Sequence, residues 1–268
     1  MSAPERQSAR TSWSRGLTVR GSWATSAVLV AGLAVAGWAA LLLWNASPHA
    51  RYLDHDGLAE ATLRHGPRLA VFLAGWVLML LAMMLPSTYP MVAALQRVVA
   101  ARPRPGSRLA ALVGGYLAVW VAVGWAAFAA DLLLHDLQAR WSGGALHGEA
   151  TMGVVLCLAG AYQLSGSKDR CLQRCRSPRA LVLAHWRGQQ PMREALELGW
   201  RHGRACVACC WALMLVMFAV GHGNLGWMLL LGGVMTAEKV LPWGRWLSAP
   251  SGLALLVAGG AMLAAVIG

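Results

Sequence analysis

The sequence predicts an all-α protein, a polytopic transmembrane bundle of about seven helices, and three observations carry this prediction. Hydrophobic residues make up 57% of the 268 residues and charged residues only 13%, whereas soluble domains carry roughly 25% charged residues. The apolar residues gather in long runs, several of which approach the roughly 20 residues that cross a bilayer as a helix. The 14 tryptophans, against three phenylalanines, fit a chain with many membrane–water interfaces.

The predicted spans follow a basic tail over residues 1–22, which we expect on the cytoplasmic side, and they divide a transmembrane domain over 23–268. Trp23 and Trp44 would anchor the first span at the two interfaces. Its apolar run is longer than the core of a signal peptide, so we interpret it as a retained helix. The spans are expected over 23–44, 69–95, 109–134, 150–166, 204–221, 225–240 and 250–267.

The second span contains two prolines within the stretch "MLPSTYPM". Proline lacks a backbone donor and clashes with the preceding helical turn. We therefore predict that Pro86 and Pro90 break the second span and that the chain continues from Met91 in a new direction. Irregular backbone at membrane depth is tolerated where it is buried in protein or lines a cavity.

The distribution of lysine and arginine supports this topology. Alternate connecting segments hold 19 of these residues on one side and four on the other. Under the positive-inside rule, seven spans then place the N-terminus in the cytoplasm and the C-terminus outside. The same rule explains the net charge of +12 and the pI near 10.5, because basic residues in the loops fix the topology of the chain in the lipid bilayer. No basic run interleaved with aromatic residues indicates nucleic acid as a partner.

The longest connecting segment, residues 167–203, is predicted to be a cytoplasmic loop rich in cysteine and arginine. Within it, "PMREALELGWRH" has helical amphipathic spacing. We expect this stretch to lie along the cytoplasmic surface of the membrane.

All six cysteines lie in the C-terminal half, and four of them form two closely spaced pairs. Cys171 and Cys175 are separated by three residues, and Cys206 and Cys209 by two, so that each pair would share one face of a helix. Disulfides are disfavoured in the cytoplasm, where such pairs more often bind metal or carry out redox chemistry. Flanking arginines favour the thiolate, which is the form that binds metal.

The cysteines of the fifth span continue into a stripe of methionines. Cys206, Cys210, Met214 and Met217 follow one another on one helical face, with Cys209 at its border. Met83 and Met84 add thioethers from the second span. Thiolates and thioethers select Cu(I) over harder ions, although methionine is also an ordinary packing residue.

Four ordered motifs resemble a bacterial family described as predicted metal-binding integral membrane proteins. They are "MLLAMMLPSTYPM", "GAYQLSGSKDRCLQRCRSP", "GWRHGRACVACCWALM" and "VMTAEKVLP", spread over about residues 76–243. The resemblance implies metal binding in a bacterial inner membrane. The family pattern falls on Met83, Met84, Pro86, Lys168, Cys171, Cys175, Pro178, Cys206, Cys209, Cys210, Trp211, Met214, Glu238 and Lys239.

These observations favour a protein that handles Cu(I), by transport or by delivery to a membrane or periplasmic metalloprotein. The expected metal ligands are Cys171, Cys175, Cys206, Cys209, Cys210, Met214, Met217, Met83 and Met84.

Two alternatives remain open at this stage. Cys206 and Cys209 could serve a membrane thiol oxidoreductase, although no quinone or flavin signature accompanies them and we favour a role other than catalysis. Zinc could instead clip the loop to the fifth span as a structural scaffold.

Overall fold

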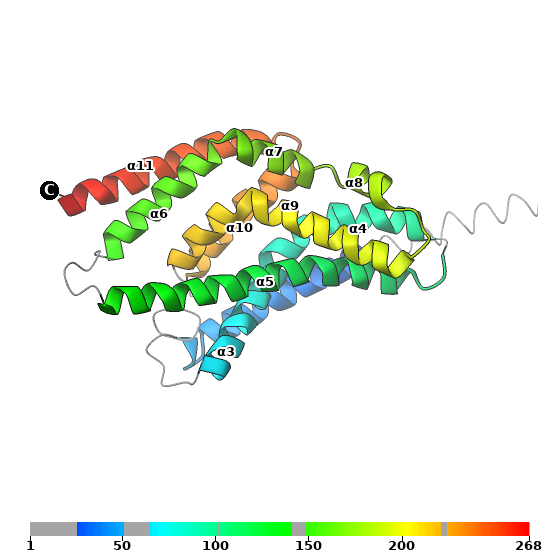
Figure 1. Cartoon of the computed structure of the whole chain (residues 1–268), viewed down its shortest axis with the longest axis horizontal. Helices are drawn as coiled ribbons and strands as arrows, with labels where there is room; N and C mark the ends of the chain where they lie inside the picture. Colours follow the sequence, from blue (N-terminus) through cyan, green and yellow to red (C-terminus); the bar gives the residue numbers. More distant parts are fainter. Residues whose placement is uncertain (1–25, 51–64, 101, 141–147, 221–223, 268) are drawn as a thin grey trace, which may run out of the picture.

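The structure, a computed structural model, is an elongated bundle of helices (Figure 1). It describes residues 26–50, 65–100, 102–140, 148–220 and 224–267, and this part of the chain contains no strand. The predicted all-α fold is thereby confirmed. The basic tail over 1–22 lies outside the described residues.

The described residues form a succession of helices. An N-terminal helix covers Ser26–Asn45. The remaining elements are α3 (His65–Met79), the π-helical segment η2 (Leu80–Met84), α4 (Leu85–Val99), α5 (Pro105–Arg140), α6 (Gly148–Gln163), α7 (Gly166–Cys175), α8 (Pro178–His185), α9 (Pro191–Val220), α10 (Leu225–Val240), the 3₁₀ turn η3 (Gly244–Leu247) and α11 (Ser248–Ile267).

The N-terminal helix packs antiparallel to the second predicted span. Its Ser26 hydroxyl donates to the Gln96 side chain at 2.5 Å, near the end of α4. Further along, a Cβ added at Gly37 would lie 3.0 Å from the backbone nitrogen of Ala82 in η2. The N-terminal helix therefore contacts both α4 and η2.

The predicted break in the second span is displaced. The helix is not ended by either proline: Pro86 stands in the first turn of α4, where a missing N–H costs nothing, and Pro90 lies inside α4. The regular α-helical hydrogen-bond pattern is instead interrupted just before the prolines, in the π-helical segment Leu80–Met84. The hydroxyls of Ser87 and Thr88 donate to the carbonyl of Met84 at 2.8 and 3.1 Å, which satisfies a group at the interruption.

Close backbone contact joins α5 and α9. A Cβ added at Gly115 would overlap the carbonyl oxygen of Leu196, and one at Gly199 would overlap that of Leu112. Small residues at a helix crossing allow such an approach in membrane proteins. This crossing brings the middle of α5 against the cysteine-bearing part of α9.

A second glycine-rich contact joins α6 and α11 along one side of the bundle (Figure 1). Gly160 approaches the Gly252 backbone, and Gly259 approaches that of Gly153 and the sulfur of Cys157. Cys157 is thus part of a helix-packing contact.

Four helical stretches are long and apolar enough to span a membrane: Ser26–Asn45, Gly66–Val99, Pro105–Leu133 and Gly244–Val266. The count of seven spans is not confirmed. Helices α6 and α10 have 16 residues each, or about 24 Å at 1.5 Å per residue. The fifth predicted span is the second half of α9, which begins at Pro191 and has 30 residues.

The segment 167–203 is mostly helical, since it contains α7, α8 and the first turns of α9. The stretch "PMREALELGWRH" therefore continues directly into the cysteine-bearing helix, with Ala195 and Leu198 buried.

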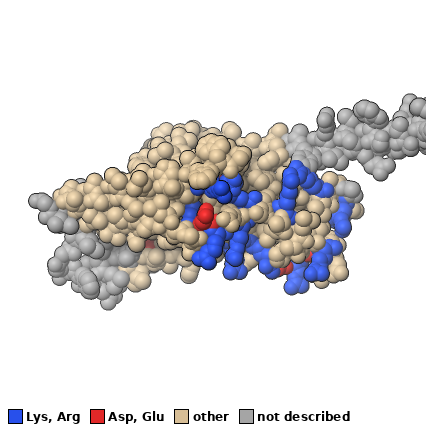
Figure 2. Space-filling model, turned by 90° about the horizontal axis from the view of Figure 1, so that it is seen from above, with Lys and Arg blue, Asp and Glu red and all other residues tan. Residues whose placement is uncertain are grey.

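The arginines and lysines visible in Figure 2 gather over one half of the molecule, and the other half shows almost none of them among the coloured residues of this face.

Candidate metal centre

The sulfur cluster lies on the buried face of α9. Cys206, Cys209 and Cys210 are each only 1% exposed. The Cys209 and Cys210 thiols donate to the Cys206 carbonyl at 3.1 and 2.9 Å, as expected for residues three and four positions along one helix.

A fourth thiol comes from α7. Cys175 is buried in the same core cluster as Cys206, Cys209 and Cys210, where α7 packs against α9. Helix α7 is fixed at its start by the Ser165 hydroxyl, which accepts from the Lys168 amide at 3.2 Å. The structure thus brings together thiols from both predicted cysteine pairs.

A buried ammonium from α10 faces these sulfurs. Lys239 Nζ lies 3.0 Å from Cys206 Sγ, 3.8 Å from Cys210 Sγ and 3.5 Å from Met84 Sδ. Within the described chain, no carboxylate pairs with Lys239. The cluster therefore already surrounds one positive charge.

Tyr116 and His202 close another side of the cluster. The Tyr116 hydroxyl lies 3.3 Å from Cys206 Sγ, and its ring lies 5.8 Å from that of His202. His202 precedes Cys206 by one helical turn and is buried. Its Nδ1 has no hydrogen-bond partner among the described residues, so it is an unsatisfied polar atom next to the thiols.

A buried ion pair holds α7 against α10 beside the cluster. Lys168 Nζ lies 2.7 Å from Glu238 Oε2, and both side chains are almost fully buried. Gln163 and Ser248 donate to Glu238 Oε1 at 3.0 and 2.9 Å. Because Glu238 is satisfied by these partners, it leaves the neighbouring Lys239 to the sulfurs.

The nine predicted ligands do not form one site. Met84 joins the four thiols through Lys239, whereas Met214 and Met217 lie eight and eleven residues beyond Cys206, about 12 and 16 Å along the helix axis. Met83 packs against Gly232 of α10. Cys171 is half-buried and lines a pocket on the outer side of the cluster.

Sequence reasoning placed Lys239 in the family pattern but not among the expected ligands, and it missed Tyr116 and His202. A signal existed for Lys239, since a lysine within an apolar helix is costly and marks function. His202 stands four residues before Cys206 in "RHGRAC", which is helical spacing for a shared face. Tyr116 carries no such signal, because it reaches the cluster through the α5–α9 crossing.

The described residues hold no group of three or more histidine, cysteine or carboxylate side chains already arranged around a metal position. Sulfurs that share one ion lie about 2.3 Å from it and hence roughly 4 Å apart. Thiols that share one buried cluster could reach that spacing by rotation about χ1, provided that Lys239 moves away. The donor set suits a soft monovalent ion.

A family of copper chaperones, PpoB2, matches residues 73–262 of this sequence, which is most of the chain. The chain belongs to the PpoB2 copper chaperone family. No curated protein and no solved structure matches the chain.

Membership of the PpoB2 family supports copper as the metal that this protein handles. The matched region contains the four clustered thiols, Met84 and Lys239, together with the four elements that contribute them, η2, α7, α9 and α10.

Proposed function

We propose that this protein is an integral membrane copper chaperone of a bacterial inner membrane, which binds Cu(I) through Cys175, Cys206, Cys209 and Cys210. The observation that carries the proposal is that thiols from α7 and α9 lie in one buried core cluster. Thiolates stabilise Cu(I) in preference to harder ions, and the copper chaperone family supports the choice of metal.

Lys239 gives this site a means to take up and release its cargo. A buried ammonium and Cu(I) carry the same charge, so one can replace the other among the sulfurs without adding net charge to the core. In the structure Lys239 contacts Cys206 and Cys210. Copper would displace it, and its return would favour release to a membrane or periplasmic metalloprotein.

The test is the metal content of detergent-purified protein. We expect about one copper per chain in the wild type, and loss of most of it in Cys175→Ser and in Cys206→Ser. Cys157→Ser is the matched control, since Cys157 contacts Gly259 of α11, and it should retain copper. Thermal unfolding of each variant checks that the fold survives.

Two outcomes would overturn the proposal. Stoichiometric zinc in place of copper would favour the structural scaffold, because four thiols also suit tetrahedral zinc. A copper content unchanged in both Cys175→Ser and Cys206→Ser would exclude the thiol cluster as the binding site.

A further inference from the structure

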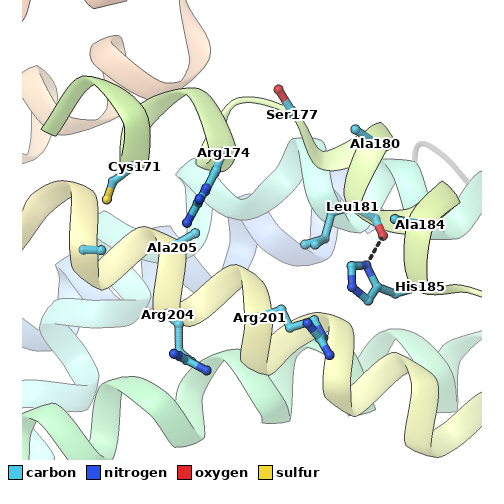
Figure 3. A pocket seen from close by; sticks show the side chains of 11 residues that line it. Cys171, Arg174, Ser177, Ala180, Leu181, Ala184, His185, Arg201, Arg204 and Ala205 are labelled. Atoms are coloured by element: carbon cyan, nitrogen blue, oxygen red, sulfur yellow. Dashed lines mark hydrogen bonds between the residues drawn. The ribbon is translucent and has the colours of Figure 1, made fainter. Parts of the chain in front are cut away.

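A pocket of about 490 Å³ lies between α7, α8 and α9 on the outer side of the thiol cluster. This volume is in the range of small-molecule sites. Figure 3 shows Arg174 directed from α7 toward α9, with Cys171 one turn earlier on the same helix. The pocket and the thiol cluster therefore lie on opposite sides of the contact between α7 and α9.

The polar lining of the pocket is basic. Arg174, Arg201, Arg204 and His185 contribute to it, and no acidic residue does. Arg201 pairs with the exposed Glu197 at 2.7 Å. In the described part of the chain, no ion pair or hydrogen bond engages the guanidinium of Arg174 or Arg204. Two unpaired guanidinium groups favour a ligand with more than one anionic group, such as a dicarboxylate.

One thiol connects this pocket with the cluster. Cys171 lines the pocket, and Figure 3 shows its sulfur directed toward α9. It precedes Cys175 by four residues, so the two share a face of α7. Ala205 and Ala208 form part of the pocket wall and directly precede Cys206 and Cys209.

We propose that this pocket docks the copper donor, a small thiol compound with two or more carboxylates that carries Cu(I) as its thiolate complex. This inference rests on the proposed function and adds the source of the cargo. Arg174 and Arg204 bind the carboxylates and bring the donor sulfur to Cys171.

Copper then passes to the protein by ligand exchange. A bond forms between Cu(I) and Cys171 Sγ while the bond between Cu(I) and the donor sulfur breaks. The proton of the Cys171 thiol goes to the departing thiolate, which leaves as a thiol. No electron is transferred, and copper remains Cu(I) as it moves on to Cys175.

Two measurements on the full-length protein in detergent test this inference. Binding of S-methylglutathione, a dicarboxylate whose sulfur cannot hold copper as a thiolate, is measured by calorimetry. The rate of copper transfer from Cu(I)–glutathione is measured by stopped flow. The test variant is Arg174→Gln/Arg204→Gln. The control, Arg170→Gln/Arg193→Gln, removes the same charge from α7 and α9 at exposed positions outside the pocket.

We expect the test variant to weaken S-methylglutathione binding by about tenfold or more, since charge-assisted hydrogen bonds are lost, and to slow transfer comparably. The control should stay within about twofold of wild type on both measures. Cys171→Ser should bind S-methylglutathione normally yet receive copper more slowly, while final copper content is kept by the four inner thiols.

Equal losses in the test and control variants would overturn the inference, because they would show only a general charge effect. Displacement of bound S-methylglutathione by phosphatidylglycerol micelles would also overturn the inference, because it would assign the pocket to a lipid headgroup. In both cases the wild type would still bind copper. Failure of the proposed function itself would instead show as absence of copper at equilibrium.

Discussion

At the scale of single residues, the unusual member of the site is Lys239. A buried ammonium is costly unless it is compensated, and here its polar contacts are Cys206, Cys210 and Met84. The residue before it, Glu238, is engaged by Lys168, Gln163 and Ser248. Neighbouring residues of opposite charge thus serve separate partners.

Replacing Lys239 with methionine is predicted to tighten copper binding. Lys239→Met keeps much of the side-chain volume, removes the competing ammonium and supplies a thioether. Because a charged hydrogen bond contributes about 1.5–3 kcal/mol, we expect the Cu(I) dissociation constant to fall by about tenfold or more. Competition with a Cu(I) chelator measures it. Weaker binding in this variant would show that Lys239 stabilises the copper-bound state.

Sequence spacing identified the thiols of this site but could not set its limits. Helical periodicity places Cys206, Cys209 and Cys210 on one face, and the structure agrees. The same periodicity extends the face to Met217, since it carries no information about depth along the axis. Met84 could be grouped with these thiols from the sequence, because its thioether is a soft ligand like the thiolates. Tyr116 could not, because only the α5–α9 crossing brings it to the cluster.

At the scale of elements, the position of the site depends on the α5–α9 crossing. We predict that Gly199→Ala is destabilising by about 1–3 kcal/mol or more, because its Cβ would overlap the Leu112 backbone. The control is Gly114→Ala, where a Cβ meets nothing within 4 Å. There the alanine should be neutral or slightly stabilising, since it favours the helix. Thermal unfolding in detergent compares the two variants. Equal melting temperatures of Gly199→Ala and Gly114→Ala would contradict the close contact between α5 and α9.

The start of α9 is held by one carboxylate. Glu194 accepts from the backbone amides of Arg187, Gly188, Gln189 and Gln190 at 2.6–2.9 Å. Desolvation acts to raise its pKa, but the four amide donors outweigh it, so the pKa of Glu194 lies below its ordinary value. A carboxylate at a helix N-terminus is also favoured by the helix dipole.

Because this pKa is depressed, the contribution of Glu194 to stability is present above the ordinary glutamate pKa and disappears as the pH falls through the folded value. We predict that Glu194→Gln lowers the unfolding free energy by about 1 kcal/mol at neutral pH. The difference from wild type should vanish under strongly acidic conditions. Urea unfolding at neutral and acidic pH measures it, and a difference that persists in acid would contradict the assignment.

The elements themselves were predictable where hydrophobic periodicity is continuous, and less so where polar residues intervene. Residues 191–203 read as a separate surface helix because Arg193, Glu194 and Glu197 interrupt the apolar run. They belong to α9 because the helix continues without a breaker through Gly199 and Gly203, which pack on α5. Similarly, prolines predict a break, but Pro86 fits the start of α4 and the interruption moves to Leu80–Met84.

At the scale of the whole molecule, two surfaces are separated along the long axis. Basic residues occupy the half of the molecule that extends from its middle to the end where α4 ends and α5 begins (Figures 1 and 2). Apolar side chains such as Leu253 and Val257 are 59% and 65% exposed on α11, which runs to the other end of the bundle (Figure 1). So large an exposed apolar surface requires lipid or protein cover, and the helical lengths favour lipid.

This separation predicts that the two ends of the chain lie on opposite sides of the membrane. Ser26 contacts Gln96 near the end of α4, at the basic end, whereas α11 finishes at the other end of the bundle (Figure 1). The chain between them therefore crosses the long axis an odd number of times. Since basic segments stay in the cytoplasm, a reporter fused before residue 1 should report the cytoplasm.

A reporter fused after residue 268 should then report the opposite compartment. The matched control is a fusion truncated after Val240, at the basic end of α10, which should return the reporter to the cytoplasm. Alkaline phosphatase and green fluorescent protein fusions distinguish the compartments. If only the four stretches that meet the length and hydropathy criteria spanned the membrane, both full-length fusions would report the same side. That result would require α6, α9 and α10 to lie within one leaflet, and would separate the thiol cluster from a transmembrane copper route.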